Sequence, residues 1–197
     1  AAENDAIVVT GVISSAGQNK IDTSISVSSL GSDAIADSNP TNLAEVFRQL
    51  PGIRSESSSG GGNSNINVRG IPISTGGAKF LSLQEDGLPI LLFGDHLFAP
   101  ADGFYKSDTS LARVESVRGG TASTLTTNGP GGIINLIGKT GKNGGGSLGF
   151  GIGLDHNDYR VDAEYGANLA DDLYFHVGGH FQQGGDYRNS GYDPVSG

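Results

Sequence analysis

The stretch GPGGIINLIGKT, residues 129–140, decides how the rest of the chain is interpreted. It ends in Gly-Lys-Thr, which closes a nucleotide-binding P-loop, where successive backbone N–H groups wrap the phosphates. That motif requires a glycine five positions before Gly138, but this position is Ile133, and Gly132 lies one residue too far away. Residues 133–137, Ile-Ile-Asn-Leu-Ile, are mostly apolar and β-branched, which favours a β-strand over a loose phosphate-binding turn. The stretch therefore predicts a strand and no nucleotide site.

The composition favours a glycine-rich β protein. The chain has 197 residues with 33 glycines, and it contains no cysteine, methionine or tryptophan. Its net charge of −9 argues against a nucleic-acid partner, because no basic patch is present to neutralise phosphates. The lack of cysteine excludes a disulfide framework and thiolate metal sites. No apolar run approaches the length of a membrane-spanning helix, so any membrane role must be carried by strands.

Residues before 142 are expected to form a small α+β domain. Apolar residues within 43–50 recur at i, i+3, i+4 and i+7, which is one face of a helix that ends before Pro51 and is capped by Thr41 or Asn42. Residues 55–65 are rich in serine and glycine and are expected to form a flexible loop. Strand-like runs occur at 21–30, 66–70, 80–84, 113–118 and 133–137.

The pattern changes at residue 147, where three segments alternate strictly between apolar and small or polar residues. Each is about ten residues long, the length of a tilted strand that crosses a membrane with its apolar side toward lipid. A meander in a soluble sandwich also alternates, but the polar positions here carry charges and histidines that a closed soluble core would reject. The expected apolar face comprises Leu148, Phe150, Ile152, Leu154, Tyr159, Val161, Ala163, Tyr165, Ala167, Leu173, Phe175, Val177, Gly179 and Phe181.

No set of residues indicates an enzyme, a cofactor site or a metal site. The G-x-G-x-x-G spacing at residues 144–149 is followed by alternating residues instead of the helix that a dinucleotide site requires. His176 and His180 would lie ~14 Å apart on a strand, too far for one ion. Asp95 and Asp102 have no acid–base partner, and the chain lacks a cysteine nucleophile and a G-x-S-x-G elbow. We therefore expect no catalytic residue and no cofactor.

Six motifs stand in a fixed order along the chain: IVVTG, NLAEVFRQLPGI, NSNINVRGI, LQEDGLPI, LARVESVRGG and GGIINLIGKT. Together with the alternating segments after them, they resemble the N-terminal part of a TonB-dependent outer-membrane receptor. The resemblance implies an α+β plug domain, a small mixed sheet with short helices, followed by the first antiparallel strands of a transmembrane β-barrel. Where family members commonly carry Pro and an ALYG-like segment after the second Arg-Gly, this chain has GTASTLTTNGPGG.

The resemblance also implies a division of the chain: residues 1–19 as an N-terminal segment, 20–142 as the plug, and 143–197 as the first three barrel strands. The family barrel has about 22 strands, so three cannot close and the remainder of the barrel is an expected partner. The implied location is the Gram-negative outer membrane, in contact with its lipid and with the N-terminus in the periplasm.

The segment Ile7-Val8-Val9-Thr10-Gly11 is implied to be the TonB box, which binds the periplasmic domain of TonB. An unpaired, β-prone segment can add to the sheet edge of such a partner through backbone hydrogen bonds. The implied function is TonB-dependent active transport of a scarce extracellular small molecule, such as a siderophore or a carbohydrate, with the plug gating the barrel.

Two further sets of site residues follow from the resemblance. Arg69, Glu115 and Arg118 match Arg-Gly and Glu-x-x-Arg-Gly positions where plug charges pair with the barrel, although solvated surface charge is the simpler alternative. Loops near 55–64, 72–79 and 93–106 are implied to reach the ligand, or else to pack the plug against the barrel. The residues expected to contact ligand are Phe93, Asp95, His96, Phe98, Phe104 and Tyr105.

A function of a different class remains open at this point. A secreted, soluble β-rich binding module or adhesin would also show alternating strands and glycine-rich loops. It predicts polar residues facing water throughout residues 147–183 and an N-terminus without a docking partner.

Overall fold

The computed structural model describes residues 7–8, 18–19, 22, 25–57, 64–71, 80–90, 105, 107–119, 122–126, 129–154 and 158–184. The chain divides into two compact units. One comprises Ala1–Ser107 with Leu111–Lys139, and the other comprises Asp108–Ser110 with Thr140–Gly197. Among the described residues, no helix has the length and apolar character needed to cross a membrane.

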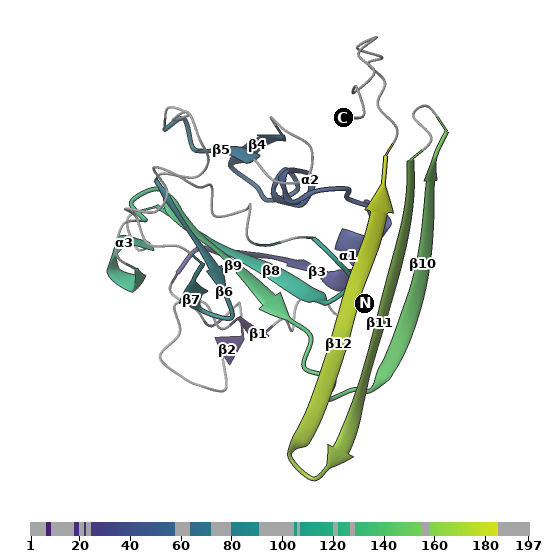
Figure 1. Cartoon of the computed structure of the whole chain (residues 1–197). Coiled ribbons are helices and arrows are strands. Elements are labelled where there is room, and N and C mark those ends of the chain that lie inside the picture. The colour runs from purple at the N-terminus through teal and green to yellow at the C-terminus, as the bar shows by residue number, and fades with distance from the viewer. Residues whose placement is uncertain are drawn as a thin grey trace, which may run out of the picture. The chain divides into compact units, whose positions relative to one another are not determined.

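A five-stranded mixed sheet forms the centre of the first unit, in the strand order β3-β8-β9-β6-β7 (Figure 1). β9 pairs antiparallel with β8 and parallel with β6, which places it in the middle of the sheet. Residues 133–137 therefore form a buried central strand, as their composition predicts. The strands are β3 (Val27–Gly31), β6 (Leu81–Glu85), β7 (Leu88–Pro89), β8 (Leu111–Arg118) and β9 (Gly132–Gly138).

The helix expected over residues 43–50 is confirmed as α2 (Leu43–Phe47), with a turn that continues to Leu50. The Asn42 side chain caps it by accepting a hydrogen bond of 3.2 Å from the backbone N–H of Glu45. In return, the Glu45 carboxylate accepts one of 2.6 Å from the backbone N–H of Thr41. The apolar face of α2 is buried, with Phe47 fully inaccessible to solvent.

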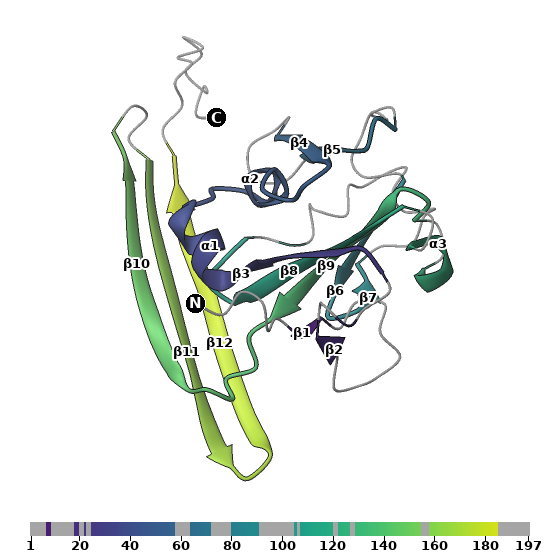
Figure 2. The same ribbon diagram turned by 180° about the vertical axis from the view of Figure 1, so that it is seen from behind.

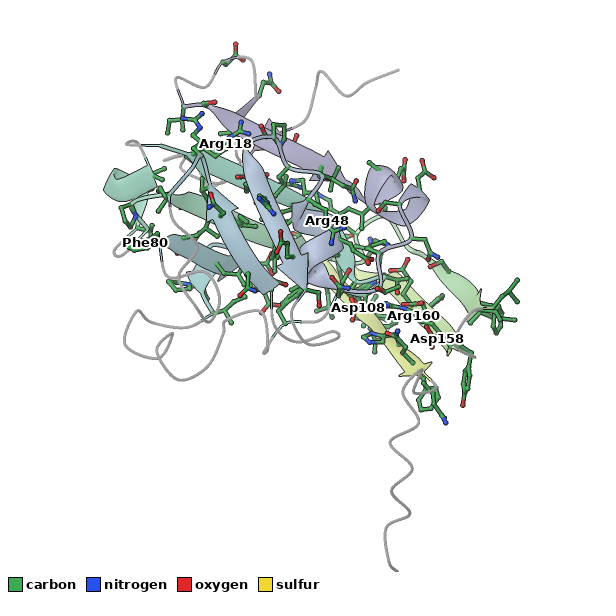
Figure 3. All side chains as sticks on the ribbon, turned by 90° about the horizontal axis from the view of Figure 1, so that it is seen from above. Arg48, Phe80, Asp108, Arg118, Asp158 and Arg160 are labelled. Carbon is green, nitrogen blue, oxygen red and sulfur yellow. The ribbon has the colours of Figure 1, made fainter. Side chains whose placement is uncertain are left out.

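A hairpin lies between β3 and β6 in the sequence and corrects one expectation. β4 (Ile53–Ser57) pairs antiparallel with β5 (Ser64–Val68), so the ends of the predicted loop 55–65 belong to strands. Ile53 and Ser55 turn inward, and the guanidinium of Arg48 (labelled in Figure 3) donates to the Ser55 carbonyl at 3.1 Å, which joins the turn after α2 to the hairpin. α1 (Ser32–Asp37) and α3 (Ala122–Leu125) are further short helices that the sequence pattern did not predict.

The main core lies on one face of the five-stranded sheet. Figures 1 and 2 show α2 and the β4–β5 hairpin on the same side of that sheet. The buried cluster consists of Ile35, Leu43, Val46, Phe47, Leu50, Ile53, Ile66, Val68, Leu81, Leu83, Leu111, Val114, Ile134 and Leu136. A smaller cluster of Val27, Val117, Ala122 and Ile133 occupies part of the opposite face.

Three long antiparallel strands make up the sheet of the second unit, in the order β10-β11-β12. These are β10 (Gly145–Gly153), β11 (Asp158–Ala170) and β12 (Leu173–Gln183). The three alternating segments are thus confirmed as strands. Their register aligns apolar residues with each other, for example Phe150 with Val161 and Val161 with Phe181, so that one apolar face runs across all three strands.

Candidate functional site

Arg118, at the C-terminal end of β8, ties three parts of the first unit together (Figure 3). Its guanidinium donates to the hydroxyl of Ser28 on β3 at 2.6 Å, and also to the carbonyl of Pro51 in the turn after α2. Burial, and in addition the positive charge of Arg69, lowers the pKa of Arg118 below its usual value. The charged form of Arg118 is therefore destabilised in this position, and a nearby anion would stabilise it.

Arg69 lies beside Arg118 because of the turn that follows β5. Arg69 and Gly70 have φ angles of 48° and 77°, and the N–H of Ile71 donates to the Val68 carbonyl at 3.0 Å, which closes a tight turn. A methyl group added to Gly52 would lie 3.7 Å from Arg69 Cγ and 3.7 Å from Arg118 Cδ. In the part of the chain that the structure describes, no ion pair with a carboxylate is found for either arginine.

Glu115 is separated from these two arginines. It lies three residues before Arg118 on the same strand, so its side chain points to the opposite face of the sheet. There it is fully buried, and Arg113 donates to its carboxylate at 2.8 Å. Arg69, Glu115 and Arg118 are the three residues expected to hold the plug to the barrel, a contact that we call the latch. The structure brings Arg69 and Arg118 together and places Glu115 elsewhere.

Glu115 belongs to a polar row that crosses the sheet, in which Glu115, Asn135 and Gln84 are buried and Ser29 is half-buried. In the strand register, Ser29 pairs with Glu115, Glu115 with Asn135, and Asn135 with Gln84. The Asn135 side chain accepts a hydrogen bond of 2.9 Å from the backbone N–H of Gly87, at the turn between β6 and β7. Sequence reasoning missed this row, although the Asn and Glu inside otherwise apolar strands were a signal for it.

The expected docking segment is described in part. Ile7–Val8 form β1, which pairs antiparallel with β2 (Gln18–Asn19) through the register Ile7 with Asn19 and Val8 with Gln18. Val9, Thr10 and Gly11 lie outside the described residues.

Most of the expected ligand-contacting residues also lie outside the described part of the chain, namely Phe93, Asp95, His96, Phe98 and Phe104. Tyr105 is described, and it packs against the main core cluster while half-buried.

The polar face of β10–β12 carries a network of paired side chains. The Glu164 carboxylate accepts from Ser147 Oγ at 2.8 Å and contacts His176 Nε2 at 2.9 Å. Arg160 and Asp162 form an ion pair of 2.7 Å. Among the residues that the structure describes, no group of three or more His, Cys, Asp or Glu side chains is arranged to hold a metal ion.

The chain combines a small mixed-sheet domain with antiparallel strands that have one apolar and one polar face. This combination is typical of outer-membrane receptors that contain a plug domain. The family model of the TonB-dependent receptor plug domain matches residues 19–133. This chain therefore belongs to the TonB-dependent receptors, and the expected fold class is confirmed. Membership of that family also supports the expectation that the chain is not an enzyme.

Solved structures show the same fold. The chain is 22% identical to the pyoverdine outer membrane receptor FpvA of Pseudomonas aeruginosa PAO1, with a TM-score of 0.66 over 87% of this chain and 24% of that one. It is 20% identical to the alcaligin outer membrane receptor FauA of Bordetella pertussis, with a TM-score of 0.64 over 93% of this chain and 31% of that one. The chain thus spans less than a third of either receptor. No curated protein sequence matched.

Proposed function

We propose that this chain is the plug and the first barrel strands of a receptor that imports a scarce extracellular ligand across the outer membrane, driven by TonB. The observation that carries this proposal is the polarity of β10–β12. The apolar residues Phe150, Ile152 and Phe181 expose 74%, 77% and 58% of their surface. On the other face, the side chains of Glu164 and His176 expose only 9% and 11%.

This distribution is the reverse of a water-soluble sandwich, which buries its apolar face and exposes its charges. It is the distribution of a barrel wall, whose apolar face contacts lipid and whose polar face lines the lumen. The alternative of a secreted soluble module would leave a continuous apolar face of three strands in water, which monomeric soluble proteins avoid.

We further propose that residues 7–11 are the segment that TonB binds, from the periplasmic side. The extended backbone of Ile7–Val8 supports this role, but this part of the segment is paired with β2 and not unpaired as expected, so docking requires its release from β2. A segment of this kind can add to the edge of the periplasmic domain of TonB. Because a ligand shifts an equilibrium only through different affinities for two states, external ligand would have to favour the state in which this segment is released.

Arg69 and Arg118 are proposed to hold the plug through carboxylates that the remainder of the barrel supplies. Two neighbouring guanidinium groups, one of them with a lowered pKa, need negative charge nearby when they are enclosed in a lumen. Glu115 does not share this contact, because it is buried on the other face of the sheet and paired with Arg113. Its proposed role is to hold the plug sheet together.

The function can be tested by growth. A strain that lacks its other receptors would express the full-length protein and receive ferric siderophores as the iron source or oligosaccharides as the carbon source, with and without TonB. The proposal expects growth on at least one of these compounds that disappears when TonB is deleted. Equal growth in the presence and absence of TonB, or no growth on any of them, would contradict it.

A further inference from the structure

The six residues between β9 and β10, Lys139 to Gly144, contain two glycines and are followed by Gly145 and Gly146. By composition this linker is a flexible tether. The structure instead places it in close contact with β11 and β12, which belong to the same compact unit as Thr140 and the residues after it.

The contact is a crossing of one backbone over another. A methyl group added to Gly166 on β11 would lie 2.8 Å from the Cα of Gly141 and 3.2 Å from the carbonyl oxygen of Phe175. A methyl group on Gly141 would overlap that same Phe175 carbonyl, with its carbon 2.6 Å away. Gly141 also has a φ of 76°, which side chains rarely adopt. Only glycine fits at both positions.

Further contacts fix the linker on either side of this crossing. The N–H of Gly144 donates to the Gly141 carbonyl at 2.9 Å, which closes a turn. The ammonium group of Lys142 lies 5.9 Å from the centre of the Tyr174 ring, within the range of a cation–π contact. Gly166, Tyr174 and His176 share the polar face of the sheet, so the linker lies on the face that the proposed function assigns to the lumen.

We propose that the crossing of Gly141 over Gly166 anchors the C-terminal end of the plug to the barrel wall. The proposal rests on the function proposed above. It implies that a pull from residues 7–8 moves the N-terminal part of the plug while Thr140 stays in place.

The order of the strands supports this asymmetry. β3, the first strand of the five-stranded sheet, lies at its edge, and among the described strands it pairs with β8 alone. Of the residues of β3, only Val27 is buried. β9, which leads directly to the anchor, lies between two strands and has five buried residues. Removing the edge strand β3 breaks the backbone hydrogen bonds to one neighbouring strand, whereas removing β9 breaks those to two. The plug is therefore expected to open from its N-terminal edge and to remain attached at its C-terminal end.

Four glycine variants of the full-length receptor test the anchor. Gly141→Ala and Gly166→Ala place a methyl group into the crossing. Gly145→Ala is the control for backbone strain, because Gly145 has a φ of 101° but nothing within 4 Å, and Gly179→Ala is the control for a strand position with open space. The probe is trypsin, which cuts after Lys139 and Lys142 when the linker opens, in membranes that contain neither added ligand nor TonB.

The expected result is a tryptic cut in the linker about tenfold faster for Gly141→Ala and Gly166→Ala than for the parent, with both controls close to the parent. Equal rates for all five proteins would overturn the anchor. If Gly141→Ala and Gly166→Ala do not assemble while both controls do, hydrogen exchange of residues 140–144 in the parent decides. Protection supports the anchor, and exchange at the rate of an unstructured peptide overturns it. Because neither measurement uses transport, a failure of the anchor is distinguishable from a failure of the proposed function.

Discussion

Arg118 donates a hydrogen bond of 2.6 Å to the hydroxyl of Ser28, and this contact joins the C-terminal end of β8 to the edge strand β3. The same guanidinium holds the Pro51 carbonyl. One side chain thus connects β3, the first strand of the five-stranded sheet, to the turn after α2. We therefore expect Arg118 to influence how easily the N-terminal edge of the plug opens.

Replacing Arg118 with methionine should loosen β3, because the variant keeps an unbranched side chain but loses both hydrogen bonds. Hydrogen bonds from charged groups contribute about 1.5–3 kcal/mol each when well formed, and partial exposure places this pair toward the lower end. Amide exchange of residues 27–31 in the full-length receptor is expected to accelerate by at least about tenfold. Ser28→Ala, which removes one acceptor, should give a smaller change. If Arg118→Met leaves exchange in β3 at the parental rate, the contact does not hold the strand.

The sign of the effect of Arg69→Gln tests the proposed latch. The lowered pKa of Arg118 means that its positive charge destabilises the folded plug. This destabilisation is fully present at every pH below the folded-state pKa of Arg118, and it is lost only as the pH rises through that pKa. If the two arginines lack an anion, Arg69→Gln should stabilise the plug slightly, by at most about 0.5 kcal/mol after screening. If barrel carboxylates pair with them, as proposed, the same change should destabilise the plug.

The measurement is the thermal or denaturant stability of the plug in the full-length receptor, between about pH 6 and pH 9, well below the range in which an arginine ordinarily loses its charge. The latch expects a loss of stability that does not depend on pH in this window and shrinks at high salt. A gain in stability would show that the two cations have no carboxylate partner.

Glu115 offers a matched comparison with Glu56. Each carboxylate pairs with an arginine two residues earlier on the same strand, Arg113 in β8 and Arg54 in β4. Glu115 is fully buried, whereas the Arg54 and Glu56 side chains are 73% and 50% exposed. Glu115→Ala should therefore destabilise the plug by about 3 kcal/mol, while Glu56→Ala should change its stability by less than about 1 kcal/mol. Similar losses in the two variants would argue that Glu115 is not part of a buried network.

A charge on the apolar face of β11 tests the membrane assignment. Val161 pairs in register with Phe150 and Phe181, so a lysine there would face hydrocarbon in the proposed barrel. Val161→Lys is expected to cost about 2–4 kcal/mol near the bilayer midplane and to reduce assembly, which is measured as the heat-modifiable band of the receptor in membranes. His180→Lys, on the polar face, should assemble normally. Unimpaired assembly of Val161→Lys would contradict a lipid-facing surface at this position.

The sequence pattern predicted those elements in which burial follows a regular period. α2 was predictable because its apolar residues recur at helical spacing, and β10–β12 because theirs alternate without a break. β4 was missed because its sequence, IRSES, has a single apolar residue and Ser55 occupies the other inward position. α1 was missed because Ile35 is its only buried residue. Short elements of this kind are stabilised by the partners that they pack against, and a local pattern does not contain those partners.

In the candidate site too, a local sequence pattern predicts some features, whereas others depend on contacts between distant elements. The resemblance selected Arg69, Glu115 and Arg118 as one group, although the two-residue period of a strand already places residues 115 and 118 on opposite faces. The turn at Arg69-Gly70, which brings Arg69 next to Arg118, depends on two positive φ angles in succession. The crossing of Gly141 over Gly166 joins positions in two different elements, and a glycine-rich composition alone predicts a tether there.

The central claim is that a pull on residues 7–11 drives transport, and Val8→Pro tests it most directly. Proline removes a backbone N–H and restricts φ, so it weakens strand pairing while leaving the plug sheet intact. The account predicts that the full-length Val8→Pro receptor binds its external ligand with unchanged affinity and no longer supports TonB-dependent uptake. A Val8→Ala receptor, which keeps the N–H, should retain most of the uptake. Uptake by Val8→Pro at the parental rate would show that this segment does not dock to TonB.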